Sequence, residues 1–176
     1  GTTYTLGDAT YGYTNGTDVY KAGSTITVDS DVALTSINDL SVTIAQGAGI
    51  RVDGTTGIRF QATVATANDA VMDMAGAAGS KVTSGMLITT NDLYENFGEL
   101  LVDSKHVKNI ENSGWYKGTE GTYCGSLVDI ADSNIIRDFT ARAYVTIEYV
   151  DGTKTTVYSA MGPVRNIKQI ANAVKK

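Results

Sequence analysis

The chain has very few of the residues on which catalytic and metal sites usually depend. Its 176 residues include one Cys, one His, one Pro and one Trp. The single Cys124 excludes an internal disulfide, and neither Cys124 nor His106 has partners at metal-ligand spacing. There is no Gly-x-Ser-x-Gly nucleophile elbow and no phosphate-binding loop. We therefore expect a protein that is not an enzyme, with Cys124 as a small packing residue and His106 as a surface or strand residue.

Positive charge and long apolar runs are also missing. The chain has 14 Lys and Arg against 19 Asp and Glu, and its formal net charge is −5. A basic surface that binds nucleic acid is therefore not expected. No run of about 18 apolar residues occurs, so the sequence predicts no membrane span. One Cys fits either a cytosolic protein or a Cys-poor bacterial surface protein. The acidic composition, rich in Thr, Gly and Tyr, favours the second, so we expect a secreted or cell-surface location.

The strongest β signal lies in residues 139–159. Apolar and polar residues alternate from residue 139 to 149, which predicts a strand with one buried face. Asp151-Gly152 then predicts a hairpin turn. A two-residue loop would place apolar residues of one strand opposite polar residues of the other. A three-residue loop with Gly152 in the left-handed region places apolar residues opposite apolar ones and polar residues opposite polar ones. We favour the second register, which pairs Tyr144 with Tyr158, Val145 with Val157, Thr146 with Thr156 and Glu148 with Lys154.

Shorter patterns fill most of the remaining chain. They predict strands at 19–20, 24–28, 32–35, 41–50, 57–64, 85–89 and 126–130, a glycine-rich loop or hairpin at 112–125, and short helices at 68–78 and 92–97. An amphipathic helix is expected to begin at Pro163, with Lys175 and Lys176 at its negative end.

These elements predict an all-β, mainly antiparallel fold. We expect a small β-rich unit at residues 1–45 and a β-sandwich-like body at residues 46–176, closed by a short C-terminal helix. The alternative is one core shared by both parts.

Two segments resemble known bacterial sequences. Residues 12–37, GYTNGTDVYKAGSTITVDSDVALTSI, resemble half of an internalin B-repeat-like surface repeat. The usual Trp before the turn is absent, and Tyr13 or Thr14 stands in its place. The resemblance implies a small β-rich extracellular unit. It rests on Tyr20, Ala22, Gly23, Ile26, Val28, Asp31, Leu34 and Thr35.

The second resemblance covers residues 50–172. The order Gly-Ile-Arg-Phe, Gly-Met-Leu-Ile-Thr, Ser-Leu-Val-Asp-Ile, Ala-Arg-Ala-Tyr-Val and Val-Tyr-Ser, followed by a short helix, is similar to an uncharacterised domain of secreted proteins from gut and rumen Firmicutes. Such domains often lie beside glycoside hydrolase, carbohydrate-binding or surface-repeat modules. The resemblance implies flanking domains in a larger protein and carries no catalytic residues.

Aromatic side chains are the candidates for ligand binding, because sugar rings stack their C–H faces on Tyr and Trp. Two surfaces are expected. The first is the polar face of the 139–159 hairpin, with Arg142, Tyr144 and Tyr158. The second is the 112–125 loop, with Trp115, Tyr116 and Tyr123. In both places the alternative is packing, with Trp115 in the core or the hairpin face under another element.

The charged residues have a structural interpretation. Most Asp residues lie at predicted turns, and no carboxylate pair stands out for glycoside hydrolysis. We expect no cofactor; calcium at Asp29-Ser30-Asp31 is the alternative, although the EF-hand pattern is absent. Arg59, Arg142 and Arg165 are expected to pair with Asp129 or Asp138.

The sequence thus predicts a non-catalytic module of a secreted or cell-surface bacterial protein that binds polysaccharide or surface glycan. The alternative is a structural spacer, or an adhesin module that binds protein. A small hydrolase is the least favoured class.

Overall fold

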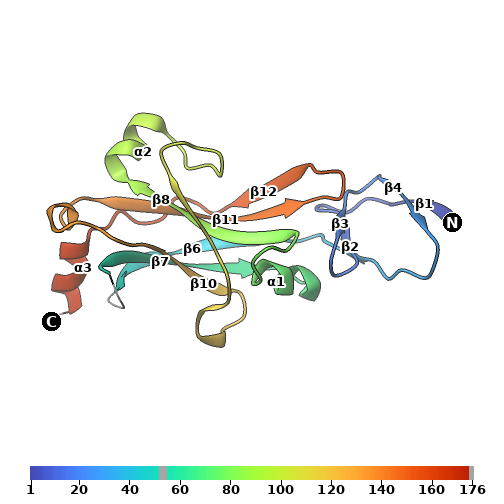
Figure 1. Ribbon diagram of the computed structural model, residues 1–176, viewed down its shortest axis with the longest axis horizontal. Helices are drawn as coiled ribbons and strands as arrows, with labels where there is room; N and C mark the ends of the chain where they lie inside the picture. Colours follow the sequence, from blue (N-terminus) through green and yellow to red (C-terminus); the bar gives the residue numbers. More distant parts are fainter. Residues whose placement is uncertain (52–54, 175–176) are drawn as a thin grey trace.

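Two antiparallel sheets face each other and form a sandwich (Figure 1). The computed structural model describes residues 1–51 and 55–174. One sheet has three strands in the order β10-β7-β6, and the other has four in the order β12-β11-β8-β9. The predicted all-β, mainly antiparallel fold is confirmed. The strands are β6 (Ser41–Arg51), β7 (Gly57–Ala65), β8 (Val82–Thr90), β9 (Lys108–Glu111), β10 (Thr122–Leu127), β11 (Phe139–Glu148) and β12 (Lys154–Tyr158).

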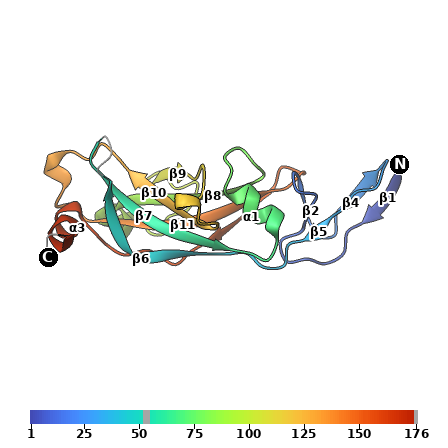
Figure 2. The ribbon, with the colours of Figure 1, turned by 90° about the horizontal axis from the view of Figure 1, so that it is seen from below.

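The N-terminal residues extend the sandwich at one end. A two-stranded ribbon of β1 (Thr2–Thr5) and β4 (Thr25–Val28) lies outermost (Figures 1 and 2). A small sheet of β3 (Val19–Tyr20), β2 (Tyr13–Thr14) and β5 (Thr35–Ser36) lies between the ribbon and the sandwich. The molecule is therefore elongated.

The small N-terminal sheet shares the core of the sandwich. Val19 and Ile37 are fully buried in the same apolar cluster as the sandwich strands. The Tyr149 hydroxyl donates to the Tyr11 carbonyl oxygen at 3.1 Å, and Val150 N–H donates to Val19 O at 2.9 Å. The boundary expected at residue 45 falls inside β6, which pairs with β7 from Ser41 onward.

The hairpin of β11 and β12 has the predicted register. Tyr144 is opposite Tyr158, and Glu148 is opposite Lys154. Gly152 N–H donates to Tyr149 O at 2.9 Å, and Gly152 has φ 84°. Glycine adopts this left-handed conformation without steric cost, so the tight turn sets the register.

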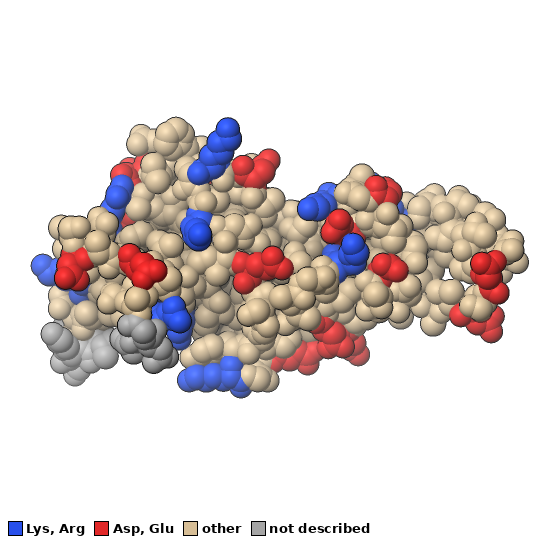
Figure 3. All heavy atoms as spheres, viewed as in Figure 1, with Lys and Arg blue, Asp and Glu red and all other residues tan. Residues whose placement is uncertain are grey.

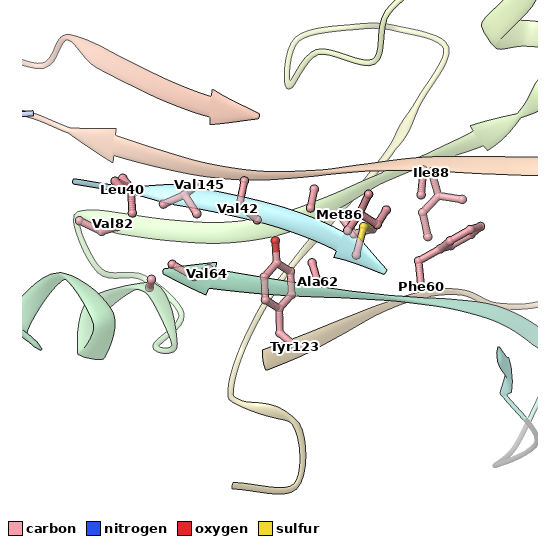
Figure 4. Packing of buried hydrophobic residues seen from close by; sticks show 14 of the residues in the cluster. Leu40, Val42, Phe60, Ala62, Val64, Val82, Met86, Ile88, Tyr123 and Val145 are labelled. Carbon is pink, nitrogen blue, oxygen red and sulfur yellow. The ribbon is translucent and has the colours of Figure 1, made fainter. Parts of the chain in front are cut away.

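The inner faces of both sheets form the core. Residues that alternate along each strand point between the layers, as Figure 4 shows for Val42, Phe60, Val82 and Val145. Phe60 and Val145 are fully buried. Burial of this apolar surface supplies the main favourable term in folding.

The helices are short. α1 (Asp69–Ala75) is capped by Asn68, whose side-chain oxygen accepts from Val71 N–H at 3.1 Å. α2 (Asn91–Phe97) has no buried residue. Two 3-10 turns, η1 (Tyr116–Gly118) and η2 (Asp132–Asn134), follow.

The C-terminal helix, α3 (Ile167–Val174), begins later than predicted. Arg165 pairs with Phe139 of β11 in an isolated bridge, which holds this segment extended. The Asn166 side chain then accepts from Gln169 N–H at 2.9 Å and caps the helix. The placement of Pro163 in the first turn is therefore wrong. Lys175 and Lys176 lie outside the described residues.

Two strand predictions are also wrong. Residues 32–34 form no strand. The strand expected at 126–130 is β10, which begins at Thr122, inside the segment expected as a glycine-rich loop or hairpin, ends at Leu127 and pairs with β7. Gly125 faces Met86 of the opposite sheet so closely that a Cβ there would overlap the Met86 side chain. This glycine therefore serves close packing of the two layers and not a turn.

Candidate functional site

One end of the polar face of the hairpin is not a free surface. Residues 98–107, which we call the strap, lie over the end that carries Arg142, Tyr144 and Tyr158. Leu100 of the strap forms a second small buried cluster with Leu87 and Tyr144 of the sheet. The Tyr144 side chain is 4% exposed, and its hydroxyl donates to Asn109 Oδ1 at 2.6 Å. Its ring therefore has no free face on which a sugar could stack.

Arg142 and Tyr158 fasten the strap to the sheet. The Arg142 guanidinium lies 4.4 Å from the centroid of the Tyr158 ring. It donates to Ser159 O at 2.8 Å and to Leu100 O at 3.3 Å. Tyr158 Oη accepts from Val102 N–H at 3.0 Å. Both side chains are used in packing, so the sequence-based assignment of Arg142, Tyr144 and Tyr158 to a binding surface is corrected.

The predicted arginine ion pairs are also wrong. Arg142 lies 3.7 Å from the Glu99 carboxylate, and no ion pair among the described residues joins Arg59, Arg142 or Arg165 to Asp129 or Asp138. Arg165 donates to Gln46 O at 3.0 Å. Asp138 instead accepts from the Asn166 side chain at 2.8 Å. Alternation of residues places an arginine on one face of a strand, but its partner depends on which loop crosses that face.

Tyr123 is a core residue. Its ring points between the two layers (Figure 4) and is 1% exposed. Its hydroxyl donates to Gly85 O at 2.8 Å and lies 3.3 Å from Tyr144 O. The sequence-based assignment of Tyr123 to the binding loop is therefore corrected, because β10 turns the ring inward.

Burial of Tyr123 should make the protein less stable in alkali. Burial raises the pKa of Tyr123 well above its ordinary value of 10. The unfolded chain would ionise this residue near pH 10 while the folded chain keeps it neutral. The neutral, buried Tyr123 therefore makes its full contribution to the free energy of unfolding below pH 10. This contribution is lost as the pH rises toward the pKa of Tyr123 in the folded protein, at about 1.4 kcal/mol per pH unit. Urea unfolding from pH 8 to 11 should show a steeper loss in the wild type than in Tyr123→Phe; equal slopes would contradict the prediction.

Trp115 and Tyr116 remain as surface candidates. Trp115 is partly buried, and its ring lies against Gly76 at the end of α1 and 6.3 Å from the Tyr123 ring. Tyr116 is partly exposed in the turn that follows. Lys117, next in the chain, has φ 49° and ψ 34°, a left-handed conformation that is uncommon outside glycine.

Tyr116 lies over a groove on the outer face of the three-stranded sheet, the side seen in Figure 2. Two adjoining hollows of about 360 and 410 Å³ form this groove, and they share Arg59, Tyr116 and Cys124. We call it the sheet groove. Its described lining is completed by Ala45, Gly47, Ala48, Gly49, Ile50, Arg51, Gln61, Ile110, Glu111, Asn112, Ser113, Gly114, Trp115, Lys117 and Ser126.

The sheet groove has polar groups on its floor and aromatic rings beside them. Arg59 and Gln61 come from alternate positions of β7 and point away from the core. Arg59 Nε donates to Ser126 Oγ at 3.3 Å. Burial raises the pKa of the Cys124 thiol, which opposes formation of a nucleophilic thiolate. The groove can therefore offer stacking surface and hydrogen bonds.

Sequence reasoning missed the floor of this groove. Arg59, Gln61 and Thr63 alternate with the buried Ile58, Phe60 and Ala62, so their outward direction was visible in the sequence. The pairing of β7 with β10, which brings Arg59 beside Ser126, was not. Asn112 supports the loop above it, because its amide donates to Ser84 Oγ at 3.1 Å and accepts from Gly114 N–H at 3.2 Å.

Gly76→Ala should displace Trp115. A Cβ at residue 76 would lie 2.5 Å from two atoms of the indole ring, so the ring must move. Overpacking of this kind costs about 1–3 kcal/mol. Because Trp115 is the chain's single Trp, its fluorescence emission reports the displacement directly and should shift to longer wavelength. Gly114→Ala is the matched control, since the space beside residue 114 is open. An unchanged spectrum for Gly76→Ala would contradict this packing.

Another hollow lies beside the N-terminal ribbon. It has a volume of about 750 Å³ and is lined by residues of β1, β4 and the 29–34 segment. Asp29 and Asp31 are among them. Within residues 1–51 and 55–174, no three His, Cys, Asp or Glu side chains gather as a metal ion would require. Calcium at residues 29–31 stays a prediction.

The chain matches no known family model and no curated protein. No helix in the described part of the chain is long and apolar enough to cross a membrane.

Proposed function

We propose that the protein is a non-catalytic, glycan-binding module of a secreted or cell-surface bacterial protein, and that the sheet groove is its binding site. The observation that carries the proposal is the position of Trp115 and Tyr116 beside the outward-facing Arg59 and Gln61 in one open groove. Sugars need this combination, because their rings present flat C–H faces and their hydroxyl groups form directional hydrogen bonds.

The location of the groove on a sheet supports the same function. Arg59 and Gln61 project from a strand that is paired on both sides, so the backbone beneath them is held firmly. A binding group on a rigid element loses little conformational freedom when ligand binds. The loop above supplies the aromatic rings, and its inner end is anchored by Trp115 on α1.

Affinity electrophoresis against a panel of soluble polysaccharides tests the proposal. Wild-type protein should be retarded by at least one of them. Tyr116→Ala should weaken that retardation about two- to tenfold, since loss of a stacking contact is worth about 0.5–1.5 kcal/mol and tenfold corresponds to about 1.4 kcal/mol. Tyr4→Ala is the matched control, because Tyr4 is 54% exposed on the distant ribbon. No retardation by any polysaccharide, or equal loss in both variants, would contradict the proposal.

The shape of the molecule favours one alternative, a structural spacer between flanking domains. The N-terminus and α3 lie at opposite ends of the elongated molecule, as a spacer in a longer chain requires (Figure 1). A pure spacer should be retarded by no polysaccharide. The resemblance of residues 12–37 to surface repeats is compatible with either function.

A further inference from the structure

We infer that the ligand of the sheet groove is an anionic polysaccharide whose carboxylate groups lie against Arg59 and Lys117. This inference rests on the proposed function and narrows its substrate class. It follows from the charge of the described lining, which has three cations, Arg51, Arg59 and Lys117, and one carboxylate, Glu111. The whole chain has the opposite balance, with a net charge of −5.

The positive charges of Arg59 and Lys117 are not neutralised by an ion pair with a carboxylate of the described residues. None of the ion pairs among residues 1–51 and 55–174 includes Arg59 or Lys117. Arg59 is partly buried on the groove floor. Its hydrogen bond to Ser126 Oγ uses Nε, which leaves the terminal nitrogens for a ligand. A guanidinium presents these nitrogens in a planar fork that matches a carboxylate.

Lys117 brings a cation next to the stacking surface. Its ammonium lies 5.1 Å from the centroid of the Tyr116 ring. The ammonium lies over one face of this ring, so a sugar ring stacked on the other face would have its substituents near a positive charge. A polyuronate has both features in each unit, a pyranose ring and a carboxylate.

Figure 3 shows blue and red side chains intermixed over one face of the molecule, with acidic side chains at the N-terminal tip. The sheet groove, with three cations and one carboxylate, therefore has the opposite charge balance from the chain as a whole, which has a net charge of −5. Such an arrangement attracts an anionic chain to the groove and repels it elsewhere.

The test compares polygalacturonate with its carboxyl-reduced, neutral form by isothermal titration calorimetry at 50 mM and 500 mM salt. Wild-type protein should bind polygalacturonate at least tenfold more tightly than the neutral polymer, and binding should weaken at the higher salt concentration. Arg59→Gln and Lys117→Gln should each reduce the affinity about tenfold. Lys168→Gln, an exposed substitution on α3, should leave it unchanged.

Three results would overturn the inference. Equal binding of the neutral polymer would remove the charge requirement and leave the proposed function standing. Equal binding of poly-glutamate would show that charge alone suffices, without a sugar. Binding of neither polysaccharide, nor of any other in the panel, would end both proposals. Circular dichroism and Trp115 fluorescence of each variant establish that the fold is intact.

Discussion

Tyr123→Ala is expected to lower the free energy of unfolding by about 3–5 kcal/mol, the range for removal of a large buried aromatic side chain. The ring is 1% exposed between the two sheets, so its loss leaves a cavity among Val64, Met86 and their neighbours. The surrounding strands are held by ladder hydrogen bonds and can collapse only partly into that space. Urea unfolding followed by circular dichroism measures the loss.

Tyr123→Phe separates the ring from the hydroxyl. It keeps the packing but removes the donor to Gly85 O and Tyr144 O, at an expected cost of about 0.5–1.5 kcal/mol. If the Tyr123 hydroxyl bound ligand, Tyr123→Phe would bind polysaccharide more weakly and would keep the free energy of unfolding of the wild type. We expect the reverse: polysaccharide retardation as in the wild type and a small loss of stability. A stable Tyr123→Ala variant that no longer bound ligand would contradict the core assignment.

Gly85→Ala is expected to lower the free energy of unfolding by about 1–3 kcal/mol. Tyr144 lies directly opposite Gly85 in the β8–β11 pair, and its ring crosses the space above the glycine. A Cβ at residue 85 would lie 2.5 Å from Cζ of that ring. The ring would have to lift, which would break its 2.6 Å hydrogen bond to Asn109 and loosen the strap.

A double-mutant cycle tests this explanation. Gly85→Ala should cost far less in a Tyr144→Ala background, because the ring that it displaces is already gone. The expected coupling is about 0.5–3 kcal/mol, typical of residues in contact. Additive effects in urea unfolding would show that Gly85 acts through the backbone and not through Tyr144. Gly49→Ala, where no atom lies within 4 Å of the added Cβ, is the matched control.

The two aromatic clusters show how alike a binding surface and a packing surface look in sequence. Tyr144 and Tyr158 on one face of a hairpin and Trp115 and Tyr116 on a loop have the same residue types. The strap covers the first pair, whereas the second lines an open groove. The sequence alone did not predict that residues 98–107 would cross the hairpin, because no local pattern encodes a contact between segments about 40 residues apart.

The sequence predicts which side chains form the polar floor of the sheet groove but not which segments surround them. Alternation along residues 57–64 directs Arg59 and Gln61 outward, which a period of two requires of any strand. Their value as a site depends on β10 pairing beside them and on the 113–121 loop lying above them. The glycines of residues 112–125 predict a loop or hairpin and give no sign of the pairing with β7, although Gly125 serves to let the two sheets approach.

The hairpin at residues 139–159 has some features that local sequence predicts and others that depend on contacts with distant segments. Its register, its turn and its buried face follow from local sequence, because alternation, Asp151-Gly152 and cross-strand pairing act over a few residues and are all satisfied by one register. That the strap lies over Tyr144 and Tyr158 while the sheet groove is open became visible in the folded chain alone. Both outcomes depend on which distant segments bury their apolar residues against each sheet. That packing is a long-range property of the whole chain, and no local pattern encodes it.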